Sequence, residues 1–230
     1  MKIKVNYLEN VLILNDSNII SVEIENKKYF YRFVNDLKSL SDLDVVEDIT
    51  FFNENNEEIN AKFKMFINYF DFEFDSKKYT NDINKYIINE MNENDKNILF
   101  KHYNKLIDSF LKILNKSDLP LQVLEDISIE NIVKNLKLSI NSKTNLLDNL
   151  LLLVELEKVL KTYNILIFIN LKQYLTSQEL IELYKYSIYN KVNIILIDSQ
   201  CYGCTLDYEK KLIIDSNLDE IMIWLNKQEI

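Results

Sequence analysis

The stretch NILIFINLKQYLTSQELIELYKYSIYNKVNIILIDS, residues 164–199, decides the fold of this chain. Residues 165–169 and 192–197 are apolar runs of strand length, and the second run is rich in β-branched residues. Between them, Thr176 and Glu179 form a T-x-x-E capping box that is followed by apolar residues at helical spacing. Strands that are apolar on both faces are typical of parallel sheets covered by helices. The stretch therefore predicts a βαβ crossover.

Outside this unit, shorter patterns predict further elements. They are an N-terminal meander of runs at 3–5, 11–14 and 19–24, a helix at about 27–41, a half-buried strand of alternating aromatic and acidic residues at 70–75, and a C-terminal strand at 212–214 followed by a closing helix at 218–224.

The middle of the chain has helical spacing. It is broken at Pro120, the only proline, and a shorter helix is expected at 128–138. Another long helix, at about 145–161, leads back into the βαβ unit. We therefore expect an α/β fold in which residues 1–75 and 146–230 form a head and residues 76–145 form an inserted α-helical leg.

Composition limits the function. The 230 residues carry a net charge of −9, from 36 acidic and 27 basic side chains, so a nucleic-acid surface requires a local basic patch. Arg32 is the only arginine, which argues against sequence-specific reading of bases. The N-terminus has no signal-peptide pattern, no apolar run is long enough to span a bilayer, and only two cysteines occur. A cytoplasmic protein without a membrane partner is expected.

Asp198 ends the second strand of the crossover, where phosphate-loop nucleotide hydrolases place a metal-binding acid. Such enzymes also need G-x-x-x-x-G-K-[ST], whose backbone N–H groups cradle the phosphates. Gly203 is the only glycine in the chain, so this loop cannot exist. The sheet is therefore predicted to be a degenerate, nucleotide-binding-like sheet, and Asp198 is expected to cap a strand end at the surface.

Cys201 and Cys204 match the C-x-x-C pattern of redox pairs. A zinc site would need four ligands, and the only histidine, His102, lies in a distant helix. A glycine turn flanked by two thiols is the favoured interpretation. A degenerate nucleotide hydrolase and a C-x-x-C oxidoreductase remain the alternatives to a binding protein, and an acidic protein-interaction module is a third possibility.

Acidic residues gather in two places. Asp71, Glu73 and Asp75 alternate along the predicted strand and are interpreted as its solvated face. The second group surrounds Pro120 at a loop-to-helix junction and consists of Asp118, Glu125, Asp126 and Glu130. Oxygen ligands at such a junction suit Ca²⁺, although an EF-hand is excluded because its loop needs a glycine. From charge clustering alone, a solvated helix start is favoured.

Basic residues are scattered as pairs, including Lys27 with Lys28, Lys134 with Lys137, and Lys210 with Lys211. Each pair is interpreted as surface charge that favours solubility. In a closed ring of identical subunits, however, a few such lysines facing the hole would be multiplied by symmetry into a phosphate-binding lining.

Residues 153–199 resemble the C-terminal half of the CRISPR-associated spacer-acquisition proteins of type II-A systems. The resemblance rests on the buried helix, the strand ending at Asn170, the segment LKQYLTSQEL at 171–180 and the second strand. The segments FEFDSKK at 72–78, MNENDKNI at 91–98 and LEDISIENIVKNLKLSI at 124–140 are similar to the insertion domain of that family. The likeness extends over nearly the whole chain and rests on pattern and order.

The resemblance implies a non-enzymatic protein that forms a homotetrameric ring and binds the ends of linear double-stranded DNA without sequence specificity. It also implies Ca²⁺ bound by acids of the leg, and assistance to the CRISPR integrase complex and effector nuclease. Glu125, Asp126 and Glu130 lie in the matching segment, and Asp118 is added because it is close in sequence. Lys27, Lys28, Lys134 and Lys137 are the predicted DNA-binding residues.

Overall fold

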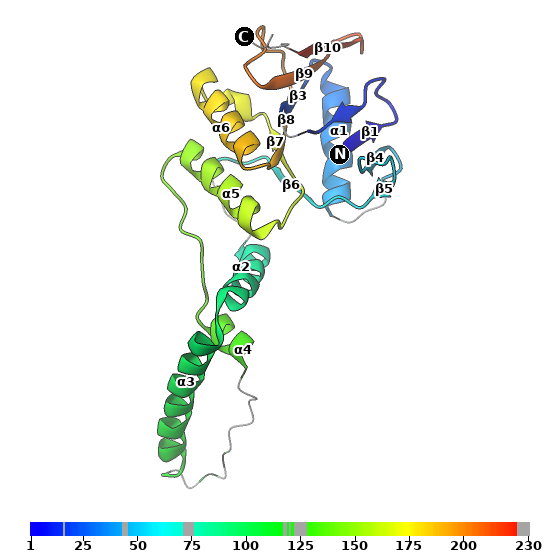
Figure 1. The fold of residues 1–230 in the computed structure, drawn as a ribbon. Helices are drawn as coiled ribbons and strands as arrows, with labels where there is room; N and C mark the ends of the chain where they lie inside the picture. Colours follow the sequence, from blue (N-terminus) through cyan, green and yellow to red (C-terminus); the bar gives the residue numbers. More distant parts are fainter. Residues whose placement is uncertain are drawn as a thin grey trace. The chain divides into compact units, whose positions relative to one another are not determined.

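The computed structural model describes residues 1–15, 17–42, 46–70, 76–116, 119, 121 and 128–224 (Figure 1). The chain divides into two compact units, which we call the α/β unit (Met1–Phe72 and Ser142–Ile230) and the helical unit (Glu73–Asn141). The boundaries expected from the sequence are 75/76 and 145/146.

The α/β unit is built on a six-stranded sheet with the order β10-β9-β3-β8-β7-β6. The strands are β3 (Ile19–Ile24), β6 (Phe63–Phe66), β7 (Ile165–Ile169), β8 (Asn193–Asp198), β9 (Glu209–Ile214) and β10 (Glu220–Trp224). Neighbouring strands from β9 to β6 are parallel, and only β10 is antiparallel to its neighbour. The predicted α/β class is confirmed.

The predicted βαβ crossover is confirmed as β7, helix α6 (Ser177–Tyr189) and β8, with Ile165 opposite Asn193 in the parallel register. The capping box begins α6 as expected. The backbone N–H of Glu179 donates to Thr176 Oγ1 at 3.3 Å, and the backbone N–H of Thr176 donates to Glu179 Oε2 at 2.8 Å. All residues of β7 are buried, in agreement with its continuous apolar sequence.

The N-terminal meander was a wrong prediction. Strands β1 (Lys2–Val5) and β2 (Leu12–Ile13) pair antiparallel in a small second sheet with β4 (Ile49–Phe52) and β5 (Glu58–Ile59), in the order β2-β1-β4-β5. Strand β3 leaves this hairpin and enters the centre of the large sheet. All six residues of β3 are buried, which suits an interior parallel strand, whereas β1 and β2 mix buried and exposed residues.

The predicted closing helix at 218–224 is also wrong, because this segment forms β10 beside β9. A tight turn reverses the chain between the two strands. Asp215 Oδ1 accepts hydrogen bonds from the backbone N–H groups of Asn217 and Asp219, and Leu218 adopts a left-handed φ of 73°. The predicted strand at 70–75 lies outside the described residues except for Phe70, which is in a turn.

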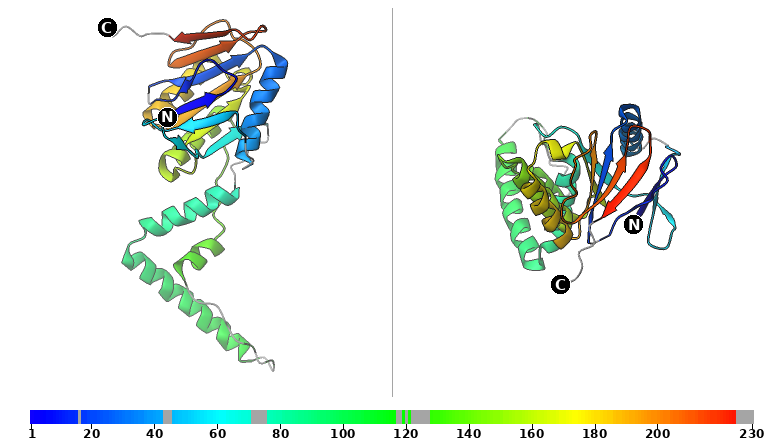
Figure 2. Two further views of the ribbon diagram at one scale, coloured as in Figure 1. Left: turned by 90° about the vertical axis from the view of Figure 1, so that its right-hand side faces the viewer. Right: turned by 90° about the horizontal axis from the view of Figure 1, so that it is seen from above.

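The large sheet is covered on both faces (Figures 1 and 2). Helix α1 (Lys27–Ser41) and the small sheet lie on one side, where Phe33 and Leu37 join a core with Val22 and Ile197. Helices α5 (Leu146–Leu160) and α6 lie on the other side and pack against each other. Both helices were predicted, and α5 begins at its cap residue Asn145.

The helical unit contains α2 (Ser76–Glu90), α3 (Glu93–Leu114) and α4 (Ile129–Asn135), and α4 contacts both other helices. Helix α3 begins with a capping box of Asn92 and Asp95. None of its 22 residues is buried, although it carries apolar residues at helical spacing. No helix in the described parts of the chain is both long and apolar enough to cross a membrane.

Candidate functional site

The carboxyl edge of the parallel strands is the place to look for a site, because open α/β sheets bind ligands there. At this edge β3 ends at Ile24 and α1 begins at Lys27, so only Glu25 and Asn26 connect them. An eight-residue phosphate loop has no room in this connection. Asn26 also accepts hydrogen bonds from the backbone N–H groups of Lys28 and Tyr29, both at 3.2 Å, which uses donors that a phosphate would need.

Four charged side chains fill the space behind this edge, on the sheet face opposite the core of α1. They are Glu23 of β3, Glu209 and Lys211 of β9, and Lys172 of the short 3₁₀ helix η1 (Leu171–Gln173). We call them the Lys–Glu cluster. Every one of these side chains is at most 3% exposed, and the two positive charges match the two negative charges.

The contacts within the Lys–Glu cluster are close. Lys172 Nζ lies 2.9 Å from Glu23 Oε1, contacts Glu209 Oε1, and donates to Ser21 Oγ at 2.8 Å. Lys211 Nζ lies 2.8 Å from Glu23 Oε1. Although burial favours the neutral amine, Glu209 and Glu23 raise the pKa of Lys172 above its usual value. Lys172 is therefore held as a cation inside the fold.

The C-x-x-C turn is hydrogen-bonded to this cluster. Lys211 Nζ donates to the carbonyl oxygens of Tyr202 and Cys204 at 2.9 and 2.8 Å, and Glu23 Oε2 accepts from the backbone N–H of Tyr202 at 3.0 Å. Both cysteines are free thiols. Burial and Glu25 raise the pKa of Cys201 to about 11, whereas a redox cysteine needs a lowered pKa. The arrangement supports the interpretation as a turn.

Asp198 was wrongly predicted to lie at the surface. It is fully buried beside Glu23, because η1 packs over the end of β8. Neither of its carboxylate oxygens has a hydrogen-bond partner among the residues that the structure describes. Burial raises the pKa of Asp198 to about 7, and Lys172 opposes that rise. The acid that suggested a metal site in the sequence is therefore a buried carboxyl group in this fold.

The four predicted DNA-binding lysines are all exposed, but they fall in different units. Lys27 and Lys28 lie in the first turn of α1, and neither side chain forms an ion pair within the described residues. Lys134 lies in the last turn of α4, and Lys137 follows that helix with a left-handed φ of 50°. Lys27 and Lys28 therefore belong to the α/β unit, and Lys134 and Lys137 belong to the helical unit.

Of the four predicted Ca²⁺ ligands, only Glu130 is described; Asp118, Glu125 and Asp126 lie outside the described residues. Glu130 is in the first turn of α4 and lines a pocket of about 240 Å³ together with Asn84 and Lys134. Asn84 Oδ1 is buried there and has no partner among the described residues.

The donors that line this pocket fit a hard cation in kind, but they are too few. A carboxylate and an amide oxygen suit Ca²⁺, which takes six to eight oxygen ligands. No group of three acidic, histidine or cysteine side chains that could hold a metal occurs in the described part of the chain. A Ca²⁺ site therefore needs acids beyond those that the structure describes.

The Lys–Glu cluster was missed at the sequence level, and Lys211 was misinterpreted as a surface charge. The signal was present, since Ser21 and Glu23 share one face of a strand that is otherwise apolar, and Glu209 and Lys211 share one face of its sheet neighbour β9. Polar residues at period two inside a buried strand indicate an internal network. Asn84 gave no comparable signal among the many asparagines of the helices.

The comparisons agree with this fold. The family model described as CRISPR-associated protein (Cas_Csn2) matches residues 42–218. The crystal structure of Stu0660 of Streptococcus thermophilus is similar in fold, with a TM-score of 0.64 and 14% sequence identity over 97% of this chain and 76% of that chain. No curated protein sequence matches the chain.

The family match shows that this α/β unit with an inserted helical unit is a CRISPR-associated protein. More particularly, the chain belongs to the Cas_Csn2 family, because the family model covers well over half of its length. The resemblance to the type II-A family seen in the sequence is confirmed.

Replacing Lys172 by Met tests the Lys–Glu cluster. The substitution leaves two buried carboxylates facing one ammonium, so we expect the free energy of unfolding to fall by about 3–5 kcal/mol in urea denaturation. The double variant Lys172→Met, Glu209→Gln restores neutrality and is expected to recover part of this decrease. Lys38→Met, on the exposed side of α1, is the matched control. Equal effects of Lys172→Met and Lys38→Met would contradict a paired cluster.

Asp198→Asn tests the burial of that carboxyl group. With a pKa raised from 3.8 to about 7, the folded state binds the proton more tightly than the unfolded state. Stability therefore falls as the pH rises through this range, and nearly the full penalty is present above pH 7. From pH 5 to pH 8, the free energy of unfolding of the variant should rise by about 3 kcal/mol relative to that of the wild type, at about 1.36 kcal/mol per pKa unit. Urea denaturation from pH 5 to 8 measures this difference; Asp148→Asn, exposed in α5, is the control, and a pH-independent difference would refute the expectation.

Proposed function

We propose that this protein is a non-enzymatic, Ca²⁺-dependent DNA-end-binding protein that forms a homotetrameric ring and assists spacer acquisition. The observation that carries the proposal is the combination of Cas_Csn2 family membership with a carboxyl edge filled by the Lys–Glu cluster. The cluster fills the interior behind the carboxyl edge, and the connection between β3 and α1 is too short for a phosphate loop. In this proposal the buried charges of the α/β unit stabilise its fold, and binding takes place at its surfaces.

In this proposal the ring surrounds the DNA duplex and binds it by electrostatic attraction. Lysines neutralise phosphates without reading bases, and closed symmetry repeats each pair of lysines in every subunit. The pair Lys27 and Lys28 supports this role, because both side chains project from the α/β unit without an ion-pair partner in the described residues. Lys134 and Lys137 are the second candidate pair.

Helix α3 supports assembly of several copies. Its apolar residues follow a four-three spacing at Leu99, Tyr103, Leu106, Phe110 and Ile113, which is typical of helix–helix seams. Leu106 and Ile113 are more than 60% exposed, so this seam is not covered within the described part of one chain. Contact between the helical units of different copies would bury it.

Ca²⁺ is proposed to bind the acids around Pro120, with Glu130 as the ligand that α4 positions. Neutralising these carboxylates would remove like-charge repulsion and hold the helical unit in the arrangement that permits a ring. The integrase complex and the effector nuclease are proposed as the partners of the assembled ring.

Binding to linear duplex DNA tests the DNA-end proposal. Gel-shift and fluorescence anisotropy experiments with Ca²⁺ should show binding to linear duplex but not to closed circular duplex, and weaker binding as salt rises. In Lys27→Gln, Lys28→Gln, the slope of log K against log salt should fall by about 0.9 for each phosphate that is no longer neutralised. Lys38→Gln, on the same helix, should leave the slope unchanged. Equal binding to both forms of DNA, or no binding, would contradict the proposal.

Light scattering tests the Ca²⁺ dependence separately. With Ca²⁺ the mass should be four times the 27.5 kDa of one chain, and chelation should lower it. Glu130→Gln removes one negative ligand and is expected to raise the Ca²⁺ concentration needed for assembly. Glu90→Gln, exposed at the end of α2, is the matched control. A monomer in the presence of Ca²⁺, or a tetramer that persists after Ca²⁺ is chelated, would be incompatible with this role.

A further inference from the structure

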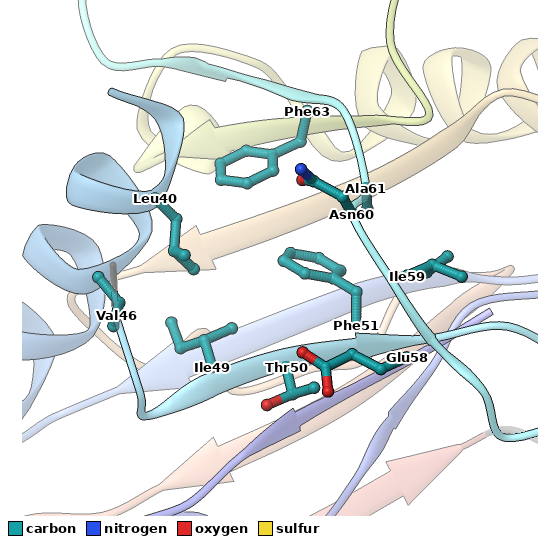
Figure 3. Close-up of a pocket in the computed structure, with 10 residues that line it drawn as sticks. All are labelled: Leu40, Val46, Ile49, Thr50, Phe51, Glu58, Ile59, Asn60, Ala61 and Phe63. Carbon is teal, nitrogen blue, oxygen red and sulfur yellow. The ribbon is translucent and has the colours of Figure 1, made fainter. Parts of the chain in front are cut away.

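A second pocket, of about 490 Å³, lies wholly within the α/β unit (Figure 3). It opens between the end of α1, strand β4, strand β5 and the segment that leads into β6. Seven of the ten described residues that line it are apolar, and the rings of Phe51 and Phe63 lie 5.6 Å apart between centroids. The volume falls in the range of about 300–1,000 Å³ that is usual for ligand pockets. We call it the edge pocket.

The polar groups of the edge pocket have unused hydrogen-bonding capacity. Thr50, Glu58 and Asn60 line it, and none of the three side chains has a hydrogen bond or ion pair with another described residue. Glu58 is the only charged residue among the described residues that line the pocket. A ligand that places a cation beside Glu58 is therefore favoured over an anionic ligand such as a nucleotide.

The backbone beside the pocket is also unpaired. Strand β5 is the last strand of the small sheet and β6 is the last strand of the large sheet, so each has a neighbour on one side only among the described strands. Of the three residues that join them, Lys62 is bonded to Asn164, whereas Asn60 and Ala61 form no hydrogen bond with any described residue, although Ala61 is only 7% exposed. Buried backbone groups are normally paired, and an added strand satisfies them.

We propose that the edge pocket is a docking site for an extended peptide segment of a partner protein. The peptide pairs with the backbone of residues 58–61 and places a large apolar side chain between Phe51 and Phe63. Residues two apart in a strand point to the same side, so a Lys or Arg two positions from the apolar residue faces Glu58. A small apolar molecule would leave the backbone of Asn60 and Ala61 unpaired, and for this reason the peptide is the better occupant.

The docking proposal is independent of the DNA-end proposal. It uses no residue assigned to DNA or Ca²⁺, so variants of the edge pocket are expected to bind linear DNA as the wild type does.

Peptide display tests the inference. Random octapeptides are selected on the full-length protein and counter-selected on Asn60→Trp, whose indole fills the pocket from an exposed position. Enriched peptides should share an apolar residue with Lys or Arg two positions away. Circular dichroism and thermal denaturation establish that the variant is folded.

A fluorescein-labelled copy of the enriched peptide then isolates each contact by anisotropy. Glu58→Lys should weaken binding about fivefold, and exchanging the peptide's basic residue for Glu should restore it. N-methylation of the peptide backbone at the pairing position should abolish binding. Glu54→Lys, on the same hairpin but outside the pocket, is the matched control. Enrichment without the shared pattern, equal binding to Asn60→Trp, or tolerance of N-methylation would overturn the proposal, as would occupation of the pocket by a second copy of this chain.

Discussion

The α/β unit depends on the Lys–Glu cluster. Moving a single charge into a protein interior costs several kcal/mol, and this cost is offset only when the charges are paired and hydrogen-bonded. Here two lysines and two glutamates neutralise each other, and the remaining capacity of Lys211 and Glu23 is used by the backbone of the C-x-x-C turn. One internal interaction therefore fixes β3, β9, η1 and the turn relative to one another.

The same interaction distinguishes this unit from the nucleotide-binding sheets that it resembles. Parallel strands, a capped crossover helix and an acid at the end of β8 are features of nucleotide-binding sheets. The space behind the carboxyl edge is nevertheless occupied by protein charges, and the connection between β3 and α1 has only Glu25 and Asn26. An anion entering this space would have to displace Glu23 or Glu209 from Lys172. The charges of this frame therefore hold β3, β9 and η1 together.

Local signals predicted local structure well. The capping box at Thr176 and the apolar run of β7 fix their own conformations, so α6 and the crossover could be read from the sequence. Strand β10 could not, because its pairing with β9 depends on a turn and on a neighbour that local periodicity does not report. Asp198 and Lys211 were misplaced for a related reason: their burial is created by η1 and by partners far away in the chain. Of the candidate metal site, only Glu130 could be placed.

Net charge sets the remaining constraint on the proposed ring. Each chain carries −9, so a ring of four repels DNA at long range. Fields between exposed charges decay over about 8–10 Å at physiological salt, and contact energy is therefore set by the few charges nearest the phosphates. Lysines such as Lys27 and Lys28, which have no ion-pair partner among the described residues, would then contribute most of the contact energy if they face the hole, whereas the distant acids mainly slow the approach of DNA. Threading from a free end suits this balance, because it replaces long-range capture by close contact on all sides of the duplex.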